Sequence, residues 1–201
     1  MVIKSAKYII SSPSVDKCPP PDMPEYAFIG RSNVGKSSLI NMLCNNDKLA
    51  KTSGTPGKTQ LINHFSINYE WYLVDLPGYG FAKVSLSSRR RWEQMIEHYL
   101  KERPNLKMVF VLIDARHTPQ KIDLEFLSQL DRWGVPFSLA FTKADKETQA
   151  VVAKHVRLFL DTMRKTWQFL PRHFVTSANK KMGKDKILDL IQELNTDETE
   201  G

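Results

Sequence analysis

Gly30-Arg31-Ser32-Asn33-Val34-Gly35-Lys36-Ser37 fits the pattern Gly-x4-Gly-Lys-Ser at every position. It follows a short apolar segment, residues 25–29, and precedes a helical pattern over about residues 36–43. The two glycines let the backbone curl so that several amide N–H groups point at one anion, and the following helix adds its positive end. We therefore predict a phosphate-binding loop, since a chance match in a chain of this length is on the order of one per cent.

Two side chains of this loop have separate tasks. Lys36 is a point charge suited to the β- and γ-phosphate oxygens of a nucleotide, and the Ser37 hydroxyl is an oxygen donor of the kind that Mg²⁺ prefers. The alternative interpretation is a glycine-containing turn before a basic helix start, which would need no ligand.

Strand and helix patterns alternate along the rest of the chain. Further strands are predicted over residues 61–67, 71–76, 108–113, 136–141 and 174–176, and helices over residues 87–103, 122–133, 148–164 and 186–194. The first two of these strands form a hairpin-like pair, which indicates one antiparallel edge strand. We predict an α/β fold of the P-loop NTPase type, with a mainly parallel six-stranded sheet, one antiparallel edge strand and helices on both faces. Ligands of such a sheet bind at the carboxyl ends of its strands.

The chain divides into three parts by composition. Residues 1–24 are predicted to be an N-terminal extension that ends in a Pro-rich run, residues 18–24, which is unsuited to regular structure. Residues 25–194 form the nucleotide-binding domain, and residues 195–201 an acidic C-terminal tail.

Composition excludes several classes of protein. The 201 residues are 41% hydrophobic and 25% charged, as in ordinary globular domains. The longest apolar run, residues 108–113, is far shorter than the roughly 18 residues of a membrane-spanning helix. The N-terminus lacks the apolar segment of a secretion signal, and Cys18 and Cys44 lack the spacing of a disulfide framework or zinc site. We therefore expect a cytoplasmic protein.

A second motif, Asp75-Leu76-Pro77-Gly78, follows the strand predicted over residues 71–76. An acidic residue at this strand end can support the Mg²⁺ shell, and the N–H of Gly78 can face the γ-phosphate. On its own, Asp-x-x-Gly is common by chance, so its position beside the phosphate loop carries the interpretation.

A third motif predicts which base is bound. Thr142-Lys143-Ala144-Asp145 follows the strand predicted over residues 136–141, and Thr176-Ser177-Ala178 follows the last strand. The carboxylate of Asp145 can accept hydrogen bonds from N1–H and the exocyclic amine of guanine, whereas adenine presents the wrong groups. Lys143 would lay its aliphatic stem over the base, and a backbone N–H of the Thr176 segment would meet guanine O6. The alternative, a solvated polar loop, stays open for these residues taken alone.

The motifs, in this order, resemble the guanine-nucleotide domain of translation-factor-related GTPases. The longer strings resemble the EngB family of Era-like bacterial GTPases over about residues 3–194. They are Phe28-Ile29-Gly30-Arg31-Ser32-Asn33-Val34-Gly35-Lys36-Ser37-Ser38, Pro56-Gly57-Lys58-Thr59-Gln60 and Asp75-Leu76-Pro77-Gly78-Tyr79-Gly80-Phe81-Ala82. The resemblance implies GTP and GDP as ligands, Mg²⁺ as cofactor, and a role in assembly of the large ribosomal subunit with effects on cell division and septation.

The resemblance also implies roles for individual residues. Thr59 would be the second Mg²⁺ ligand beside Ser37, with Thr55 as a nearby rival. Lys36, Thr59, Gly78 and Asn33 would serve hydrolysis. The remaining nucleotide contacts would come from Gly30, Arg31, Ser32, Val34, Gly35, Gly57, Lys58, Gln60, Leu61, Asp75, Leu76, Pro77, Thr142, Lys143, Ala144, Asp145, Thr176, Ser177 and Ala178. Thr142 replaces the Asn of most GTPases, so we expect the phosphate loop to lose a side-chain brace and affinity to be modest.

Hydrolysis is expected to be slow without a partner. The segment Tyr79-Gly80-Phe81 supplies no glutamine to orient the attacking water, as Ras-type enzymes have after the corresponding glycine. In Era-like relatives, a residue in the position of Asn33 can coordinate K⁺ near the β–γ bridge, and we expect the same option here.

The net charge of +7, from 29 Lys and Arg against 22 Asp and Glu, favours an anionic partner. Arg89-Arg90-Arg91-Trp92 and Lys180-Lys181-Met182-Gly183-Lys184 are basic runs that can contact phosphates, although a solvated basic face is the commoner meaning of such runs. The five histidines show no metal-ligand spacing. We expect a monomer that binds the large ribosomal subunit and its RNA, and neither DNA nor membranes.

The leading interpretation is a GTPase that acts as a molecular switch, and three other functions are disfavoured by features of the sequence. A constitutive RNA-binding assembly factor with a structural nucleotide site is disfavoured by the intact set Lys36, Ser37, Thr59 and Asp75. An ATP-dependent small-molecule kinase is disfavoured by Asp145 and by the lack of an Arg-rich lid insertion. A membrane-bound division GTPase is disfavoured because no amphipathic basic helix or lipidation motif is present.

Overall fold

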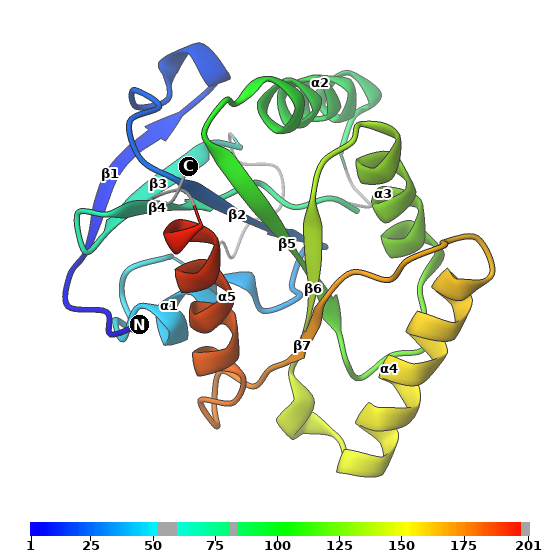
Figure 1. The fold of residues 1–201 in the computed structure, drawn as a ribbon. Coiled ribbons are helices and arrows are strands. Elements are labelled where there is room, and N and C mark those ends of the chain that lie inside the picture. The colour runs from blue at the N-terminus through cyan, green and yellow to red at the C-terminus, as the bar shows by residue number, and fades with distance from the viewer. Residues whose placement is uncertain (52–59, 81–83, 198–201) are drawn as a thin grey trace.

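A computed structural model describes residues 1–51, 60–80 and 84–197. These residues form one seven-stranded sheet in the order β1-β3-β4-β2-β5-β6-β7 (Figure 1). The strands are β1 (Ala6–Ser12), β2 (Glu25–Gly30), β3 (Ile62–Ile67), β4 (Trp71–Asp75), β5 (Leu106–Asp114), β6 (Phe137–Thr142) and β7 (His173–Val175). The helices are α1 (Lys36–Leu43), α2 (Leu86–Glu102), α3 (Lys121–Arg132), α4 (Gln149–Arg164) and α5 (Lys184–Thr196), with short 3-10 turns η1 (Val15–Lys17) and η2 (Ala144–Lys146).

The α/β class and the mainly parallel sheet are confirmed. Strand β2 pairs in parallel with β4 and β5, and β6 pairs in parallel with β5 and β7. Strand β3 is antiparallel to both of its neighbours, β1 and β4. The sheet has seven strands in the described residues, so the predicted count of six is wrong. The antiparallel strand β3 was predicted at the edge of the sheet, but β1 pairs with its outer side and is the edge strand.

Strand β1 comes from the predicted N-terminal extension. Its sequence, Ala-Lys-Tyr-Ile-Ile-Ser-Ser, contains β-branched and aromatic residues that suit a strand, but four consecutive residues of it are exposed. Alternation of apolar and polar residues is the usual sequence signal of an outer strand. This segment lacks the alternation because it has no buried face. The turn between β3 and β4 holds the residues just before β1. Oδ1 of Asn68 accepts from the backbone N–H of Lys4 at 2.7 Å and from that of Ser5 at 3.1 Å.

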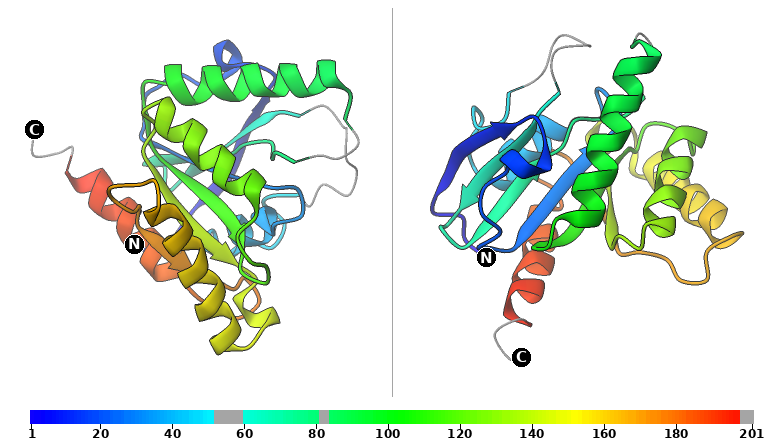
Figure 2. Two further views of the ribbon diagram at one scale, coloured as in Figure 1. Left: turned by 90° about the vertical axis from the view of Figure 1, so that its right-hand side faces the viewer. Right: turned by 90° about the horizontal axis from the view of Figure 1, so that it is seen from above.

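Helices cover both faces of the sheet, as predicted. Figures 1 and 2 show α1 and α5 on one face and α2, α3 and α4 on the other. Alternate residues of β2 separate the two cores: Tyr26 and Phe28 pack with α1 and α5, whereas Ala27 and Ile29 pack with α2, α3 and α4. This period of two is what a strand buried on both faces requires.

A buried ionic cluster ties the N-terminal segment to the sheet. Glu25, at the start of β2, is fully buried and accepts from the hydroxyl of Tyr99 at 2.7 Å and from Nη2 of Arg103 at 2.5 Å. His64 Nε2 lies 2.9 Å from the same carboxylate, and Arg103 Nη2 also donates to the carbonyl of Pro19 at 2.8 Å. The cluster therefore joins β2, β3, α2 and the Pro-rich run at the end of the sheet opposite the phosphate loop.

None of the helices in the described ranges is both long enough and apolar enough to cross a membrane.

Candidate nucleotide-binding site

The loop between β2 and α1 has the backbone conformation that its glycines predict. Gly35 caps α1 with φ +96°, a left-handed conformation that favours glycine, and Asn33 has φ +65°. A Cβ on Gly30 would lie 2.8 Å from Cγ1 of Val34 and 3.1 Å from the carbonyl oxygen of Leu112. The loop therefore closes tightly over the end of β2, which is the shape that turns backbone N–H groups toward an anion.

The lysine and the acidic residue predicted for phosphate and Mg²⁺ meet beside this loop. Strand β4 runs parallel to β2, with Asp75 in register with Phe28, so that Asp75 ends its strand close to the first turn of α1. Its carboxylate contacts Nζ of Lys36, and burial lowers the pKa of Lys36 to about 8. Ser37, the next residue, donates its hydroxyl to the carbonyl of Lys51 at 3.1 Å.

The segment after Asp75 packs directly on the phosphate loop. A Cβ on Gly78 would lie 2.6 Å from the carbonyl oxygen of Gly30, so that only glycine fits there. The N–H of Tyr79 donates to that carbonyl at 3.1 Å, and the N–H of Ser32 donates to the carbonyl of Tyr79, also at 3.1 Å. Leu76 is fully buried in the core, so only its backbone is available to a ligand.

The side chain of Tyr79 points away from the loop and into helix α3. Its ring stacks on Phe126 at 4.6 Å between centroids, and its hydroxyl donates to Asp123 at 2.7 Å. Nε of Arg31 lies 3.3 Å from the same Asp123 oxygen. Burial raises the pKa of Asp123 above its ordinary value despite these two neighbours. Sequence reasoning missed Asp123, because an acidic residue in the first turn of a helix is ordinary.

Thr142 does brace the phosphate loop. Its hydroxyl donates to the carbonyl of Val34 at 2.6 Å, from the end of β6. The expectation that a threonine here leaves the loop without a side-chain brace is therefore wrong, because the shorter side chain reaches a carbonyl of the loop. The reason given for modest affinity is removed with it.

Most of the residues predicted to bind guanine, though not Ala144 or Ser177, line a cavity of about 150 Å³ at the ends of β6 and β7. Asp145 accepts from the hydroxyl of Ser177 at 2.8 Å and from Nδ2 of Asn179 at 3.1 Å. The bond from Ser177 is the main cause that lowers the pKa of Asp145, which keeps it an acceptor. The residues that line the cavity include Gly35, Ser38, Thr142, Lys143, Asp145, Thr176, Ala178 and Asn179. Ser38 and Asn179 were not predicted as contacts: Ser38 ends the longer string that carries the family resemblance but has no role in it, and Asn179 lies just after Thr176-Ser177-Ala178.

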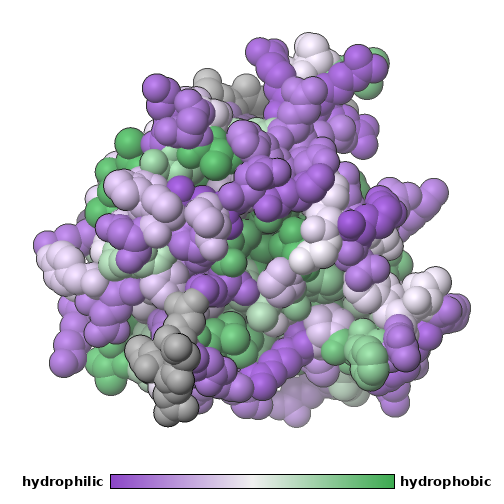
Figure 3. All heavy atoms as spheres, turned by 45° about the horizontal axis from the view of Figure 1, so that its top comes forward, coloured by the Kyte–Doolittle hydropathy of each residue, from purple (hydrophilic) through white to green (hydrophobic). Residues whose placement is uncertain are grey.

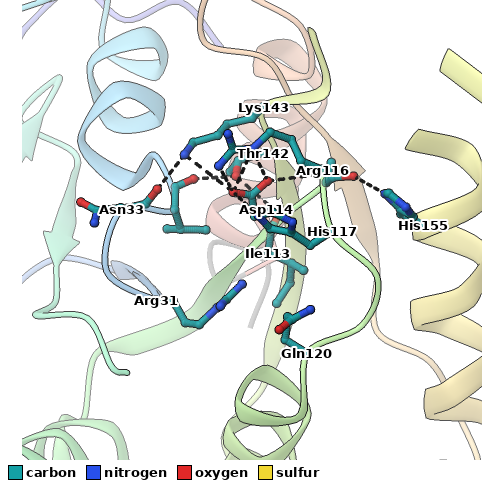
Figure 4. A network of polar contacts seen from close by, with 12 residues as sticks. Arg31, Asn33, Ile113, Asp114, Arg116, His117, Gln120, Thr142, Lys143 and His155 are labelled. Atoms are coloured by element: carbon teal, nitrogen blue, oxygen red, sulfur yellow. Dashed lines mark hydrogen bonds and ion pairs between the residues drawn. The ribbon is translucent and has the colours of Figure 1, made fainter. Parts of the chain in front are cut away.

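Lys143 connects this cavity with the phosphate loop. Its Nζ donates to the carbonyl of Asn33 at 2.7 Å and lies 3.7 Å from Oδ2 of Asp114 (Figure 4). Asp114 also accepts from Nη2 of Arg116 at 2.8 Å. Sequence reasoning missed Asp114, although an acidic residue at the carboxyl end of a central strand is the signal that identified Asp75.

The other predicted contacts lie outside the described ranges or at their edge. Gly57, Lys58 and Thr59, with the rival Thr55, lie outside the described residues. Gln60 and Leu61 come just before β3 and are half-buried.

The two basic runs lie on the surface. The three arginines at residues 89–91 are exposed near the start of α2, and Arg89 pairs with Glu93 at 3.4 Å. Lys180 and Lys181 are exposed before α5, and Nζ of Lys184 contacts the amide oxygen of Asn45. The face that carries α2 is largely hydrophilic, with scattered apolar areas (Figure 3).

The chain is similar to a known protein family and to individual proteins. Residues 25–143 match the model of a family described as 50S ribosome-binding GTPase. A probable GTP-binding protein EngB from Phocaeicola vulgatus is 56% identical over 195 residues, which are 97% of this chain and 98% of that protein.

Two solved structures have the same fold. The crystal structure of a probable GTP-binding protein EngB superposes with a TM-score of 0.62 at 23% identity, over 86% of this chain and 99% of that chain. Era in complex with MgGDPNP and a segment of 16S ribosomal RNA superposes with a TM-score of 0.61 at 22% identity, over 86% of this chain and 56% of that chain.

Proposed function

Because this chain belongs to the EngB family of GTP-binding proteins, we propose that it is a Mg²⁺-dependent GTP switch in assembly of the large ribosomal subunit, linked to cell division and septation. One observation carries the proposal. Lys36, Asp75 and Gly78 meet against the phosphate loop, on the same edge of the sheet as the cavity that holds Asp145. Phosphate and guanine contacts at one edge are what a guanine nucleotide requires.

The residues at the phosphate loop fit a Mg²⁺ ion. The hydroxyl of Ser37 and the carboxylate of Asp75 are both hard oxygen donors, and they flank the lysine expected at the phosphates. Thr59 is the further ligand that the family implies. Ser37 and Asp75 would hold such an ion beside the phosphates, where its positive charge would offset the negative charge that develops on the transferred phosphoryl group.

Hydrolysis would depend on position and charge alone. Lys36 and the N–H groups near Gly78 would stabilise the transferred phosphoryl group, and no side chain is needed as a nucleophile. Tyr79 is bonded to Asp123 and stacked on Phe126, which supports the absence of a water-orienting side chain at that position. We therefore propose slow intrinsic hydrolysis that a partner accelerates.

The ribosomal part of the proposal draws on the relatives. The matching family is described as 50S ribosome-binding, and the Era structure contains ribosomal RNA. The exposed arginines at residues 89–91 follow the second motif closely in the chain and can contact RNA phosphates. We propose a cytoplasmic monomer whose contact with the large subunit depends on the bound nucleotide, without DNA or membranes as partners.

Co-sedimentation with purified large ribosomal subunits tests this proposal. We expect the protein to pellet with a non-hydrolysable GTP analogue, much less with GDP or an ATP analogue, and less at high salt. The Lys36→Ala variant should lose the dependence on nucleotide, because the phosphates lose their cation. A matched exposed variant, Lys154→Ala, should pellet like the wild type. Pelleting that is equal with every nucleotide would favour the constitutive RNA-binding factor instead.

Potassium provides a separate test of Asn33. Lys143 donates to the backbone carbonyl of Asn33, and the side-chain amide of Asn33 points away from that contact (Figure 4). We propose that this amide coordinates K⁺ near the β–γ bridge, so single-turnover hydrolysis should be faster in KCl than in NaCl. Equal rates in the two salts would reject the cation.

A further inference from the structure

The carboxylate of Asp114 lies where three strand ends meet, and the proposed chemistry does not use it. Asp114 ends β5, and its side chain is only 6% exposed. Oδ2 lies 3.7 Å from Nζ of Lys143, which comes directly after β6, and the same Nζ donates to the carbonyl of Asn33, beyond the end of β2, at 2.7 Å (Figure 4). Asp114 is thus linked through one ammonium group to the phosphate loop.

The residue that carries this ammonium group and the residue whose carbonyl it contacts both have a costly backbone conformation. Asn33 has φ +65° and Lys143 has φ +60°, in the left-handed region that residues with a side chain rarely adopt. Such conformations persist where surrounding contacts hold them, and they cluster at functional sites. The stem of Lys143 also passes over Gly35, since a Cβ on Gly35 would lie 3.4 Å from Cε of the lysine. The position of the ammonium group therefore restrains both loops.

The Asp114 carboxylate is itself held in place and kept charged. Oδ1 accepts from the backbone N–H of Arg116 at 3.0 Å and from its Nε at 3.1 Å, and Oδ2 accepts from Nη2 at 2.8 Å. His117 Nε2 lies 3.8 Å from Oδ2. Burial opposes ionisation, but the bonds from Arg116 and the charge of Lys143 outweigh it and lower the pKa of Asp114. Asp114 is therefore a fixed negative charge.

We infer that Asp114 is a positioning residue for the guanine nucleotide: its charge holds Lys143 against the phosphate loop and so slows nucleotide release. The inference rests on the proposed nucleotide site and deepens it. Without the carboxylate, the ammonium group loses an ion pair, and the two left-handed residues lose a restraint. The loops would then separate more often and the nucleotide would leave faster. Asp145, which reads the base, touches neither Asp114 nor Arg116 in the described contacts and would keep its selectivity.

A double-mutant cycle on nucleotide release tests the inference. A fluorescent GDP analogue is loaded and chased with excess GDP in the wild type, Asp114→Asn, Lys143→Ala and the double variant. Asp114→Asn should speed release about tenfold, as expected for the loss of a charged contact. In the Lys143→Ala background the same change should matter less than about twofold, because its target is gone. A merely structural role of Asp114 would speed release equally in both backgrounds.

Controls keep the two proposals apart. Asp161→Asn, which removes an exposed carboxylate from α4, should release GDP like the wild type. Discrimination between GDP and inosine diphosphate, which lacks the 2-amine, should be unchanged by Asp114→Asn. If circular dichroism shows that Asp114→Asn does not fold, Asp114→Ser replaces it under the same criteria, since its hydroxyl is a shorter acceptor for the N–H of Arg116.

The outcomes separate clearly. Unchanged release by Asp114→Asn, or additive effects in the cycle, would overturn the role of Asp114 while the nucleotide site stands. A wild-type chain that does not bind the analogue would overturn the proposed function, and this inference with it.

Discussion

Asp145→Asn should weaken GDP binding by about 10²–10⁴-fold, because two hydrogen bonds to a charged acceptor are lost at roughly 1.5–3 kcal/mol each. A carboxylate has about four acceptor positions, and Ser177 and Asn179 use two of those on Asp145. The other two would accept from N1–H and the 2-amine of guanine. An asparagine amide would turn an N–H toward those donors and leave them unpaired.

The same variant should gain affinity for xanthosine diphosphate. Xanthine has a carbonyl where guanine has the 2-amine, and the asparagine N–H can donate to it. Titration of both proteins with the guanosine, xanthosine, inosine and adenosine diphosphates measures the change. Asp131→Asn, an exposed residue at the far end of α3, is the matched control and should bind like the wild type. Wild-type GDP affinity in Asp145→Asn would mean that another residue reads the base.

Glu25→Gln should lower the free energy of unfolding by about 3–5 kcal/mol, the usual cost of breaking a buried ion pair from one side. Arg103, whose side chain is only 5% exposed, would then be a buried charge without its carboxylate. Chemical unfolding followed by circular dichroism measures the loss. Glu193→Gln, which breaks an exposed pair with Arg172 at 2.9 Å, should change stability little and is the matched control. Equal losses in the two variants would show that the cluster does not stabilise the fold.

Acid should act on the same cluster. Burial opposes ionisation of Glu25, but the bonds from His64, Arg103 and Tyr99 outweigh it and lower its pKa from 4.5 to about 2. A carboxyl whose pKa is lower in the folded state than in the unfolded state stabilises the fold at pH values above its unfolded-state pKa. That stabilisation is lost as the pH falls toward and through its folded-state pKa. The free energy of unfolding of the wild type should therefore fall by about 3 kcal/mol between pH 5 and pH 2 through this group. Glu25→Gln has no carboxyl there, so this part of the pH dependence should be missing from the variant. Parallel pH profiles of the two proteins would contradict this assignment.

Local patterns were enough to predict the phosphate loop and the class of the fold. The run from Gly30 to Ser37 specifies its own backbone through two glycines and a helix start, and β5 is recognisable as a continuous apolar segment. Helix positions followed from a period of 3.6 residues, which is written within each segment. The order of these elements then left a parallel sheet covered on both faces as the consistent arrangement.

Only the tertiary structure decided which polar residues face one another. Thr142 bonds to Val34 across 108 residues of chain, and Glu25 meets Arg103 across 78. Neither pairing has a local pattern, because each partner follows the rules of its own strand or helix. The same reason hid Asp114 and Asp123, whose partners come from other elements, and β1, whose exposed residues show no alternation. The sequence by itself determined the phosphate loop, the five described helices and the six strands from β2 to β7, whereas packing of the sheet determined the place of β1 and the buried charges around the site.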